Sequence, residues 1–329
     1  MHNRVNWTLA IPTEVRCEYA GIPQGVYYTD LEQTIRVCQL FPPAFAKATD
    51  FLPETTYSVP VTAYEGVAAL GGDLVFPTEH QPMIRNQGHV LDTLAVDTVI
   101  VPDPNLDKRF LLHVDLLHEL ERRFPNQVVR GGLAGQEGPI TTAGLLYGQQ
   151  FFLDCLDNPP RAHRLLTLCT ELYIRWLQAD DAVCGVQRTI VGIADDYAGL
   201  LSPALWPEFV LPYYQRICTA VGPKGCALHS ELLRRQHLPL LHALPLVSLN
   251  LGENQYLQPE DVAAELPDVP FGWHILAVAE MQQGTPELIQ HRFKHLVNRG
   301  VRHVLVELAV GTPPDNVRAF VQVGRELAG

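Results

Sequence analysis

The sequence predicts an α/β fold, a (β/α)8 TIM barrel with an N-terminal extension, and three observations lead to this fold class. From about residue 128, short β-branched runs alternate with longer helical segments, as in parallel sheets covered by helices. The 329 residues contain roughly eight strand candidates, which favours a closed barrel over an open sheet. No GxGxxG or GxxxxGKS/T phosphate loop follows a strand candidate, which disfavours a nucleotide-binding fold. We expect one domain over residues 1–329, with residues 1–50 as the extension packed on it.

The expected elements follow one another in order along the chain. In the first third, strands are expected at residues 58–61 and 97–101, and helices at 31–46 and 107–123. The later strands are expected at 127–133, 187–194, 225–229, 246–251, 271–278 and 301–306. The later helices are expected at 141–157, 161–178, 203–220, 259–265, 285–299 and 315–327. For the helix at 203–220, Ser202 is expected as the N-cap and Pro203 as the first helical residue.

The composition disfavours several classes of protein. With 36 acidic and 24 basic residues the formal net charge is −12, and no Lys/Arg cluster opposes it, so nucleic acid and anionic lipid are repelled. The N-terminus lacks the pattern of a secretory signal, and no segment nears the roughly 18 apolar residues of a membrane span. The seven cysteines are scattered and form no CxxC pair, as expected for reduced thiols. We therefore expect a cytoplasmic protein.

Polar residues stand where three apolar strands end. They are Asp195 and Asp196 after the strand at 187–194, His229 and Glu231 at the next strand end, and Glu307 after the last strand. Barrel enzymes build their active sites at the C-terminal ends of strands, so Asp195, Asp196 and His229 are candidate catalytic residues. Adjacent side chains of an extended segment point to opposite sides, so only one of the two aspartates can face the barrel mouth. The sequence leaves open which one does.

His229 and Glu231 form a candidate metal site. They are separated by one residue, so on an extended chain both side chains point to the same side. Glu307 could join them as a third ligand from another strand. One imidazole and two carboxylates are compatible with Zn²⁺ in an open catalytic site, and also with Fe²⁺ or Mn²⁺. Alternatively, the two glutamates pair with nearby arginines and His229 is simply hydrogen-bonded.

Several motifs together resemble the uroporphyrinogen-decarboxylase-like superfamily. They are GPITTA at 138–143, DYAGLLSP at 196–203, FVLPY at 209–213, QGTPE at 283–287 and GTPPDNV at 311–317. The resemblance covers about residues 130–320 and implies a (β/α)8 barrel. The true decarboxylases of this superfamily carry an Arg-rich N-terminal segment that holds the porphyrinogen carboxylates. Here Arg4, Arg16 and Arg36 are dispersed, which disfavours porphyrinogen decarboxylation.

The chain is more similar to the cobalamin-dependent methyltransferases of that superfamily. These enzymes bind zinc through a His-x-Cys at one strand end and a cysteine at the last strand. The position of His-x-Cys matches His229-Ser230-Glu231, with glutamate in place of cysteine, and the last cysteine falls near Val306 or Glu307. The resemblance therefore implies a metal site in which carboxylates replace thiolates.

This exchange suggests a substrate, because a His/Glu/Glu site leaves the metal more electrophilic than a thiolate-rich site. Methyl transfer from an ether needs a Lewis acid on the leaving oxygen, and a Co(I) corrinoid could then take the methyl group. The resemblance thus implies a methyltransferase that uses Zn²⁺ or another divalent metal, with cobalamin carried by a partner protein. O-demethylation of a small methoxylated substrate is preferred and thiol methylation is the second choice. Assembly as a homodimer is also considered.

Two other hypotheses stay open. The chain could be a metal-free lyase or hydrolase that uses Asp195 or Asp196 with His229 as acid–base residues, in which case it keeps full activity in chelator. It could also be a non-catalytic barrel that binds a tetrapyrrole or corrinoid. Ligand binding would then survive in Glu231→Gln and Glu307→Gln variants that show no turnover.

Overall fold

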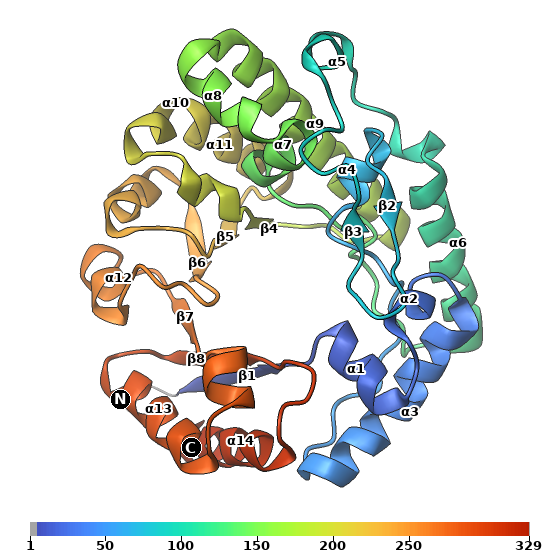
Figure 1. Ribbon diagram of the computed structural model, residues 1–329, viewed down its shortest axis with the longest axis vertical. Coiled ribbons are helices and arrows are strands. Elements are labelled where there is room, and N and C mark those ends of the chain that lie inside the picture. The colour runs from blue at the N-terminus through green and yellow to red at the C-terminus, as the bar shows by residue number, and fades with distance from the viewer. Residues whose placement is uncertain (1–4, 329) are drawn as a thin grey trace. The chain divides into compact units, whose positions relative to one another are not determined.

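The computed structural model describes residues 5–328, and its internal contacts divide the chain into two units. Within the described residues, unit 1 comprises 5–57, 76–81 and 249–328, and unit 2 comprises 58–75 and 82–248. In Figure 1 unit 1 therefore combines blue segments with the orange and red ones, whereas unit 2 is mainly cyan, green and yellow. The expected single domain over residues 1–329 stays a prediction.

The strands of unit 1 form a parallel sheet in the order β1-β8-β7-β6. They are β1 (Asn6–Ala10), β8 (His303–Glu307), β7 (Phe271–His274) and the last two residues of β6 (Leu246–Asn250). Ala10 lies opposite Glu307, so β1 and β8 end at the same edge of the sheet. The alternate residues Val304 and Val306 are fully buried, which gives β8 one face in the core.

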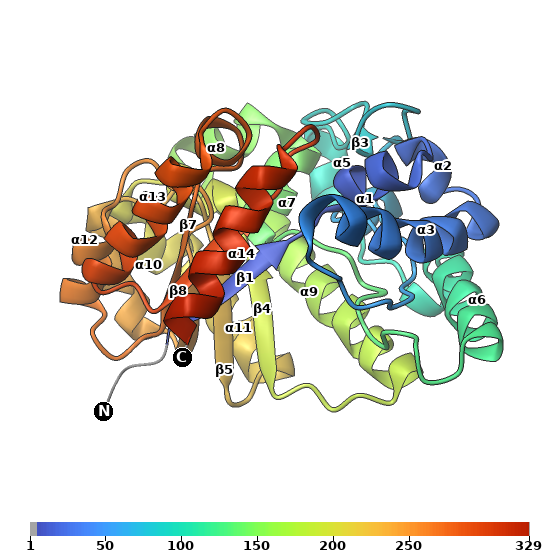
Figure 2. The same ribbon diagram turned by 90° about the horizontal axis from the view of Figure 1, so that it is seen from below.

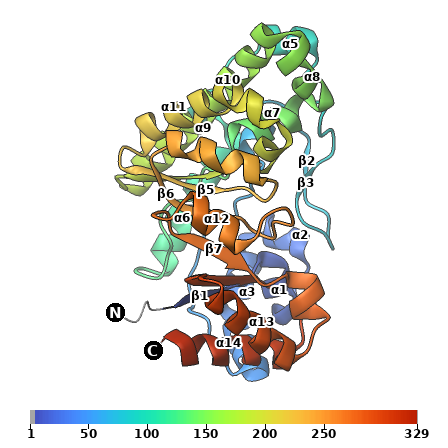
Figure 3. The same cartoon turned by 90° about the vertical axis from the view of Figure 1, so that its left-hand side faces the viewer.

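The helices of unit 1 are α1 (Thr13–Ala20), α2 (Gln24–Tyr27), α3 (Leu31–Thr49), α12 (Pro259–Glu265), α13 (Pro286–Asn298) and α14 (Pro314–Ala328), with a π-helical turn at Ala277–Gln282. Of these, α14 packs on β1 and α13 on β8. Figures 2 and 3 show α13 beside α14, and the rings of Phe293 and Phe320 lie 5.4 Å apart. Trp7 of β1 contacts Phe320 from the sheet side, at 5.9 Å between ring centroids. Apolar packing therefore holds α14 on β1.

The long helix α3 confirms the helix expected at 31–46 and has a well-defined start. The Asp30 carboxylate accepts hydrogen bonds from the backbone N–H groups of Glu32 and Gln33, at 2.9 and 3.3 Å. This is the N-cap interaction that satisfies N–H groups left without partners in the first turn. The ring of Tyr19 in α1 packs on Phe45 of α3 at 5.0 Å, so these two helices form one layer.

Unit 2 contains the central strands and the longest helix. Its strands are β4 (Ile190–Ala194), β5 (Gly225–His229), the start of β6, and the antiparallel pair β2 (Leu74–Val75) and β3 (Met83–Ile84). Its helices are α4 (Glu65–Ala69), α5 (Thr93–Thr98), α6 (Lys108–Arg123), α7 (Pro139–Tyr147), α8 (Gln149–Asp157), α9 (Pro159–Cys184), α10 (Trp206–Phe209) and α11 (Leu211–Val221). Short 3₁₀ turns lie at Pro104–Leu106, Asp196–Leu200, Pro203–Leu205 and Arg235–Ala243.

The core of unit 2 lies between its parallel strands and α9 to α11, which are green and yellow in Figure 1. Trp176, Trp206 and Tyr214 are among its largest fully buried side chains. The Tyr173 hydroxyl of α9 donates to the Gly192 carbonyl of β4 and so links this helix to the sheet. Among the described residues no helix is both long and apolar enough to cross a membrane. All seven cysteines are buried, and no disulfide occurs in the part of the chain that the structure describes.

The structure corrects three expected strands. Residues 97–101 are not a strand, because Asp92 caps α5 by accepting the Ala95 N–H at 2.8 Å and residues 93–98 are helical. Residues 127–133 do not form a strand either, since Asp180 accepts the N–H groups of Gly132 and Leu133 at 2.9 and 3.2 Å. Residues 58–61 are irregular, and the proline at position 60 has no N–H to donate to a neighbouring strand.

The second half of the chain follows the expected alternation more closely. β4 to β8 all fall within or overlap the expected strands, whereas β1 was not expected as a strand. The helix expected at 141–157 is interrupted between α7 and α8, where Gly148 has a φ of 63°. Glycine adopts this left-handed conformation without the strain that a side chain would cause.

Candidate functional site

Asp195 follows β4 directly and is fully buried. Its carboxylate accepts hydrogen bonds from the backbone N–H groups of Ile140 and Thr141, at 3.0 and 2.7 Å, and from the Thr141 hydroxyl at 2.8 Å. These groups belong to the first turn of α7, where helical N–H groups lack partners within the helix. Burial raises the pKa of Asp195 to about 6. Asp195 thus caps α7 from a neighbouring strand end, and its catalytic role stays a prediction.

The backbone is packed closely around this cap. A Cβ atom on Gly138 would lie 2.5 Å from the Asp195 carboxyl group, so a larger residue cannot enter without displacing it. The Gly138 N–H also donates to the Ala194 carbonyl at 2.5 Å. The loop before α7 is therefore held directly against the end of β4.

Asp196 is the aspartate that lies beside His229. Its Oδ1 atom is 3.8 Å from His229 Nε2, and it accepts the Glu231 N–H at 2.7 Å. About a third of each side chain, Asp196 and His229, is exposed. β4 and β5 are parallel, with Ala194 opposite His229, so the residues after both strands emerge at the same edge. The structure therefore brings together two of the predicted catalytic residues, a carboxylate and an imidazole.

Glu137 is a candidate site residue that the sequence analysis missed. Burial, followed by the charges of Asp195 and Asp196, raises the pKa of Glu137 to about 8. A carboxyl group that keeps its proton at neutral pH can serve as a general acid. Glu137 lies in the loop before α7, adjacent to the GPITTA motif, and one isolated glutamate in a loop gives no sequence signal of this kind.

The predicted metal ligands lie at two strand ends. His229 ends β5 and Glu231 follows it in unit 2, whereas Glu307 ends β8 in unit 1. Within residues 5–328 no group of three His, Cys, Asp or Glu side chains is placed so as to hold a metal ion. The donor chemistry itself fits a borderline-hard divalent cation, since it combines imidazole nitrogen with carboxylate oxygen. The three-ligand set stays a prediction.

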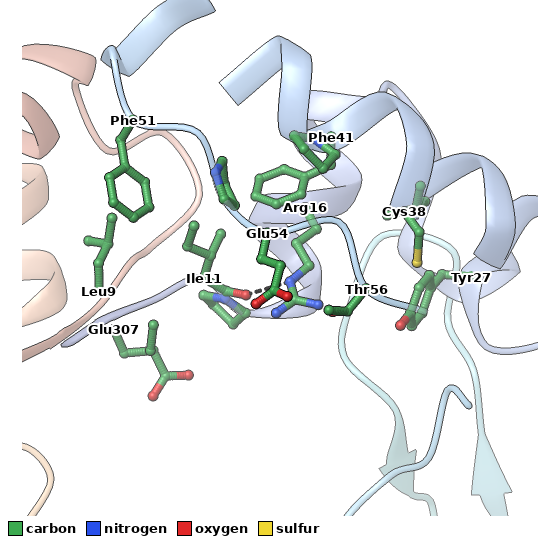
Figure 4. Close-up of a pocket in the computed structure, with 15 residues that line it drawn as sticks. Leu9, Ile11, Arg16, Tyr27, Cys38, Phe41, Phe51, Glu54, Thr56 and Glu307 are labelled. Carbon is green, nitrogen blue, oxygen red and sulfur yellow. Dashed lines mark hydrogen bonds between the residues drawn. The ribbon is translucent and has the colours of Figure 1, made fainter. Parts of the chain in front are cut away.

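Glu307 lines a pocket of about 500 Å³ in unit 1, at the ends of β1 and β8. Figure 4 shows its carboxylate at the edge of the pocket, with Glu54 and Arg16 farther along the same wall. Arg16 Nε donates to the Ile11 carbonyl at 2.7 Å, and its guanidinium lies 6.0 Å from the centroid of the Phe41 ring. Two carboxylates and one guanidinium thus give this pocket a net negative character.

Comparison with known proteins places these features in a family. The profile of the uroporphyrinogen decarboxylase (URO-D) family matches residues 59–327. The chain belongs to the URO-D family. Its sequence is 30% identical to the uroporphyrinogen decarboxylase of Xanthomonas axonopodis pv. citri over 156 residues, 45% of this chain and 42% of that protein. The chain therefore spans less than half the length of this relative. It is 23% identical to the Thermus thermophilus decarboxylase over 289 residues, 79% and 76% of the two chains.

A solved structure also has a similar fold. The fold matches a methyltransferase from Methanosarcina mazei with a TM-score of 0.72 and 17% identity, over 99% of this chain and 95% of that one. The predicted α/β-barrel fold class and the predicted superfamily are thereby confirmed. The curated proteins of this family that the chain matches are decarboxylases, so the chain is a member of a family that includes enzymes.

Proposed function

We propose that this URO-D family member is a methyltransferase that moves a methyl group between a small substrate and a corrinoid carried by a partner protein. The preferred reaction is demethylation of a methoxylated substrate, and methylation of a thiol is the second choice. The observation that carries the proposal is the acid–base cluster of unit 2. There Asp196 Oδ1 lies 3.8 Å from His229 Nε2, and burial together with the charges of Asp195 and Asp196 raises the pKa of Glu137 to about 8.

The charge of the unit 1 pocket argues against a porphyrinogen substrate. A polycarboxylate needs several cationic partners, because each desolvated carboxylate must be compensated. Of the arginines in the first fifty residues that the structure describes, Arg16 lines the pocket, whereas Arg36 is exposed and bonds to Gln33. The other two charged residues of the lining, Glu54 and Glu307, are acidic and offer a substrate carboxylate no cationic partner. This supports the methyltransferase branch over decarboxylation.

Glu137 is suited to the proton transfer that ether cleavage requires. When the C–O bond breaks, its electron pair stays on the oxygen, and the carbon forms a new bond with the nucleophile that supplies its own pair. The leaving alkoxide or phenolate then needs one proton, which the carboxyl group of Glu137 donates. Asp196 accepts the Glu231 backbone N–H, and its Oδ1 atom lies 3.8 Å from His229 Nε2, so it fixes the loop after β5.

Two bound groups would complete this site. A divalent metal held by His229 and Glu231 would supply a Lewis acid for the leaving oxygen. Glu307, which ends β8 in unit 1, stays a third ligand expected from the sequence alone. The corrinoid of a docked partner would supply the nucleophile that accepts the methyl group. Both groups belong to the proposal, and the donor chemistry of the imidazole and carboxylates supports the first of them.

The proposal is tested with purified protein, 2-methoxyphenol and chemically reduced cob(I)alamin as the methyl acceptor. We expect stoichiometric divalent metal, loss of the Co(I) absorption spectrum, and release of catechol in an equal amount. Glu137→Gln should reduce the rate by about 10²-fold or more, the usual contribution of a general acid. The proposal would be refuted if the protein contained no divalent metal. It would also be refuted if the protein transferred a methyl group neither from an ether nor to a thiol.

A metal-free lyase is the second candidate function, and the distance of 3.8 Å between Asp196 and His229 favours it specifically. A carboxylate close to an imidazole can serve with it as an acid–base pair, and such a pair needs no metal. The two candidates differ in their response to chelator. The lyase keeps its full activity after dialysis against EDTA, whereas the methyltransferase loses it and regains it when metal is returned.

A further inference from the structure

Unit 2 contains a second and larger cavity, of about 860 Å³, which we call the aromatic pocket. Its walls come from residues 87–93, α7, α8 and the turn after β4. Its most informative lining residues are three aromatic side chains and three amides: Tyr147, Phe152, Tyr197, Gln87, Gln149 and Gln150. Its volume lies in the range of roughly 300 to 1,000 Å³ typical of small-molecule sites.

Tyr197 gives the aromatic pocket a fixed wall. Its backbone N–H donates to the Thr141 hydroxyl at 3.0 Å, and its ring lies 6.3 Å from the Phe152 ring. The ring packs on Gly144, where a Cβ atom would lie 2.6 Å from the ring carbon Cδ2. Because Tyr197 is the residue after Asp196, this wall is continuous with the candidate acid–base site of unit 2.

The chemistry of the lining indicates an uncharged ligand. No lysine, arginine or glutamate is among the described residues that line the cavity, and its one histidine, His89, is exposed, so an anion would find no buried cationic side chain to pair with. The one carboxylate of the lining, Asp92, accepts the Ala95 N–H as the N-cap of α5. Aromatic walls favour a flat ring in an offset or edge-to-face arrangement, and side-chain amides can both donate to and accept from oxygen substituents.

We infer that the aromatic pocket binds a neutral aromatic ring with oxygen substituents, so that the methyl donor is a methoxylated arene. The statement that the methyl donor is a methoxylated arene rests on the proposed function and names its substrate class. The pocket itself is argued from unit 2 alone, so binding can be measured without the corrinoid partner and without turnover.

The test is isothermal titration calorimetry of the full chain with three probes. We expect 2-methoxyphenol to bind, methoxycyclohexane to bind about tenfold more weakly because it lacks the flat ring, and 4-methoxybenzoate to bind more weakly because of its charge. Gly144→Ala should weaken 2-methoxyphenol binding about tenfold, since the added methyl displaces the Tyr197 ring. Gly192→Ala is the matched control, because a Cβ atom there meets nothing within 4 Å.

Each outcome decides a different point. The inference that the aromatic pocket binds an aromatic ring would be refuted by equal affinities for 2-methoxyphenol and methoxycyclohexane. It would also be refuted if the Gly144→Ala variant bound 2-methoxyphenol as tightly as the unaltered chain does. Should Gly144→Ala fail to fold by circular dichroism, Phe152→Leu replaces it and is expected to show the same loss of affinity. Selective arene binding without methyl transfer to cob(I)alamin would support the pocket while the proposed function fails.

Discussion

Replacement of Asp195 by asparagine tests whether a buried carboxylate caps α7. Burial raises the pKa of Asp195 from its ordinary value of 3.8 to about 6 in the folded chain. Between these values the folded chain holds a proton that the unfolded chain has released, so stability falls as pH rises. A difference of about 2 pH units, at roughly 1.4 kcal/mol per unit, corresponds to about 3 kcal/mol. This contribution is present below pH 3.8 and is lost as pH rises through about 6.

Asparagine has no charge to titrate, so the variant lacks this pH dependence. We expect the difference in free energy of unfolding, unaltered chain minus Asp195→Asn, to shrink by about 2 to 3 kcal/mol between pH 4 and pH 7. Urea unfolding followed by tryptophan fluorescence suits the measurement, because Trp176 and Trp206 are fully buried. Asp196→Asn is the matched control, since that side chain is 36% exposed. A difference that stays constant within about 0.5 kcal/mol over this range would refute the reasoning.

Three further predictions concern the site and its support. Glu137→Gln should lower the methyl-transfer rate. In the unaltered chain this rate is expected to fall as pH rises through about 8, because the donor acid deprotonates there, and the variant should lack this fall. If the rate of the variant still falls near pH 8, another group causes the fall. EDTA should remove activity and bound metal together, and His229→Ala should lower metal content in elemental analysis; unchanged content would exclude His229 as a ligand. Arg109→Ala should lower the free energy of unfolding, measured with urea, by about 3 kcal/mol, because the buried Glu65 carboxylate loses its hydrogen bonds of 2.6 and 2.9 Å from the Arg109 guanidinium. A decrease below about 1 kcal/mol would contradict this.

The second half of the fold could be predicted from the sequence because its strands are short apolar runs between clear helices. β5 and β8 lie where the β-branched runs end in polar residues. In the first half, local polar contacts outweigh strand propensity. Asp92 converts residues 93–98 into a helix, and Asp180 binds the N–H groups that residues 132 and 133 would have donated to a strand. Such contacts depend on partners distant in the sequence, or on one cap, and a propensity pattern does not contain them.

The candidate site could be predicted only in part from the sequence. Alternation along a strand indicates that Asp195 and Asp196 point to opposite sides, but the inward side depends on where α7 begins. Once α7 is in place, Asp195 caps it and Asp196 faces His229. Glu137 could not be found from sequence, because its raised pKa comes from burial and from two carboxylates more than fifty positions away.

Asp195 and Asp196 have different structural roles, and this difference affects how easily each position can be substituted during evolution. Position 195 is constrained by three hydrogen bonds and by the absence of a side chain at Gly138, so a change there requires compensating changes in another segment. Position 196 contacts the β5 end through one backbone N–H and one imidazole. A lineage can therefore alter its chemistry at position 196 by single substitutions, while its neighbour preserves the starting point of α7 through each step.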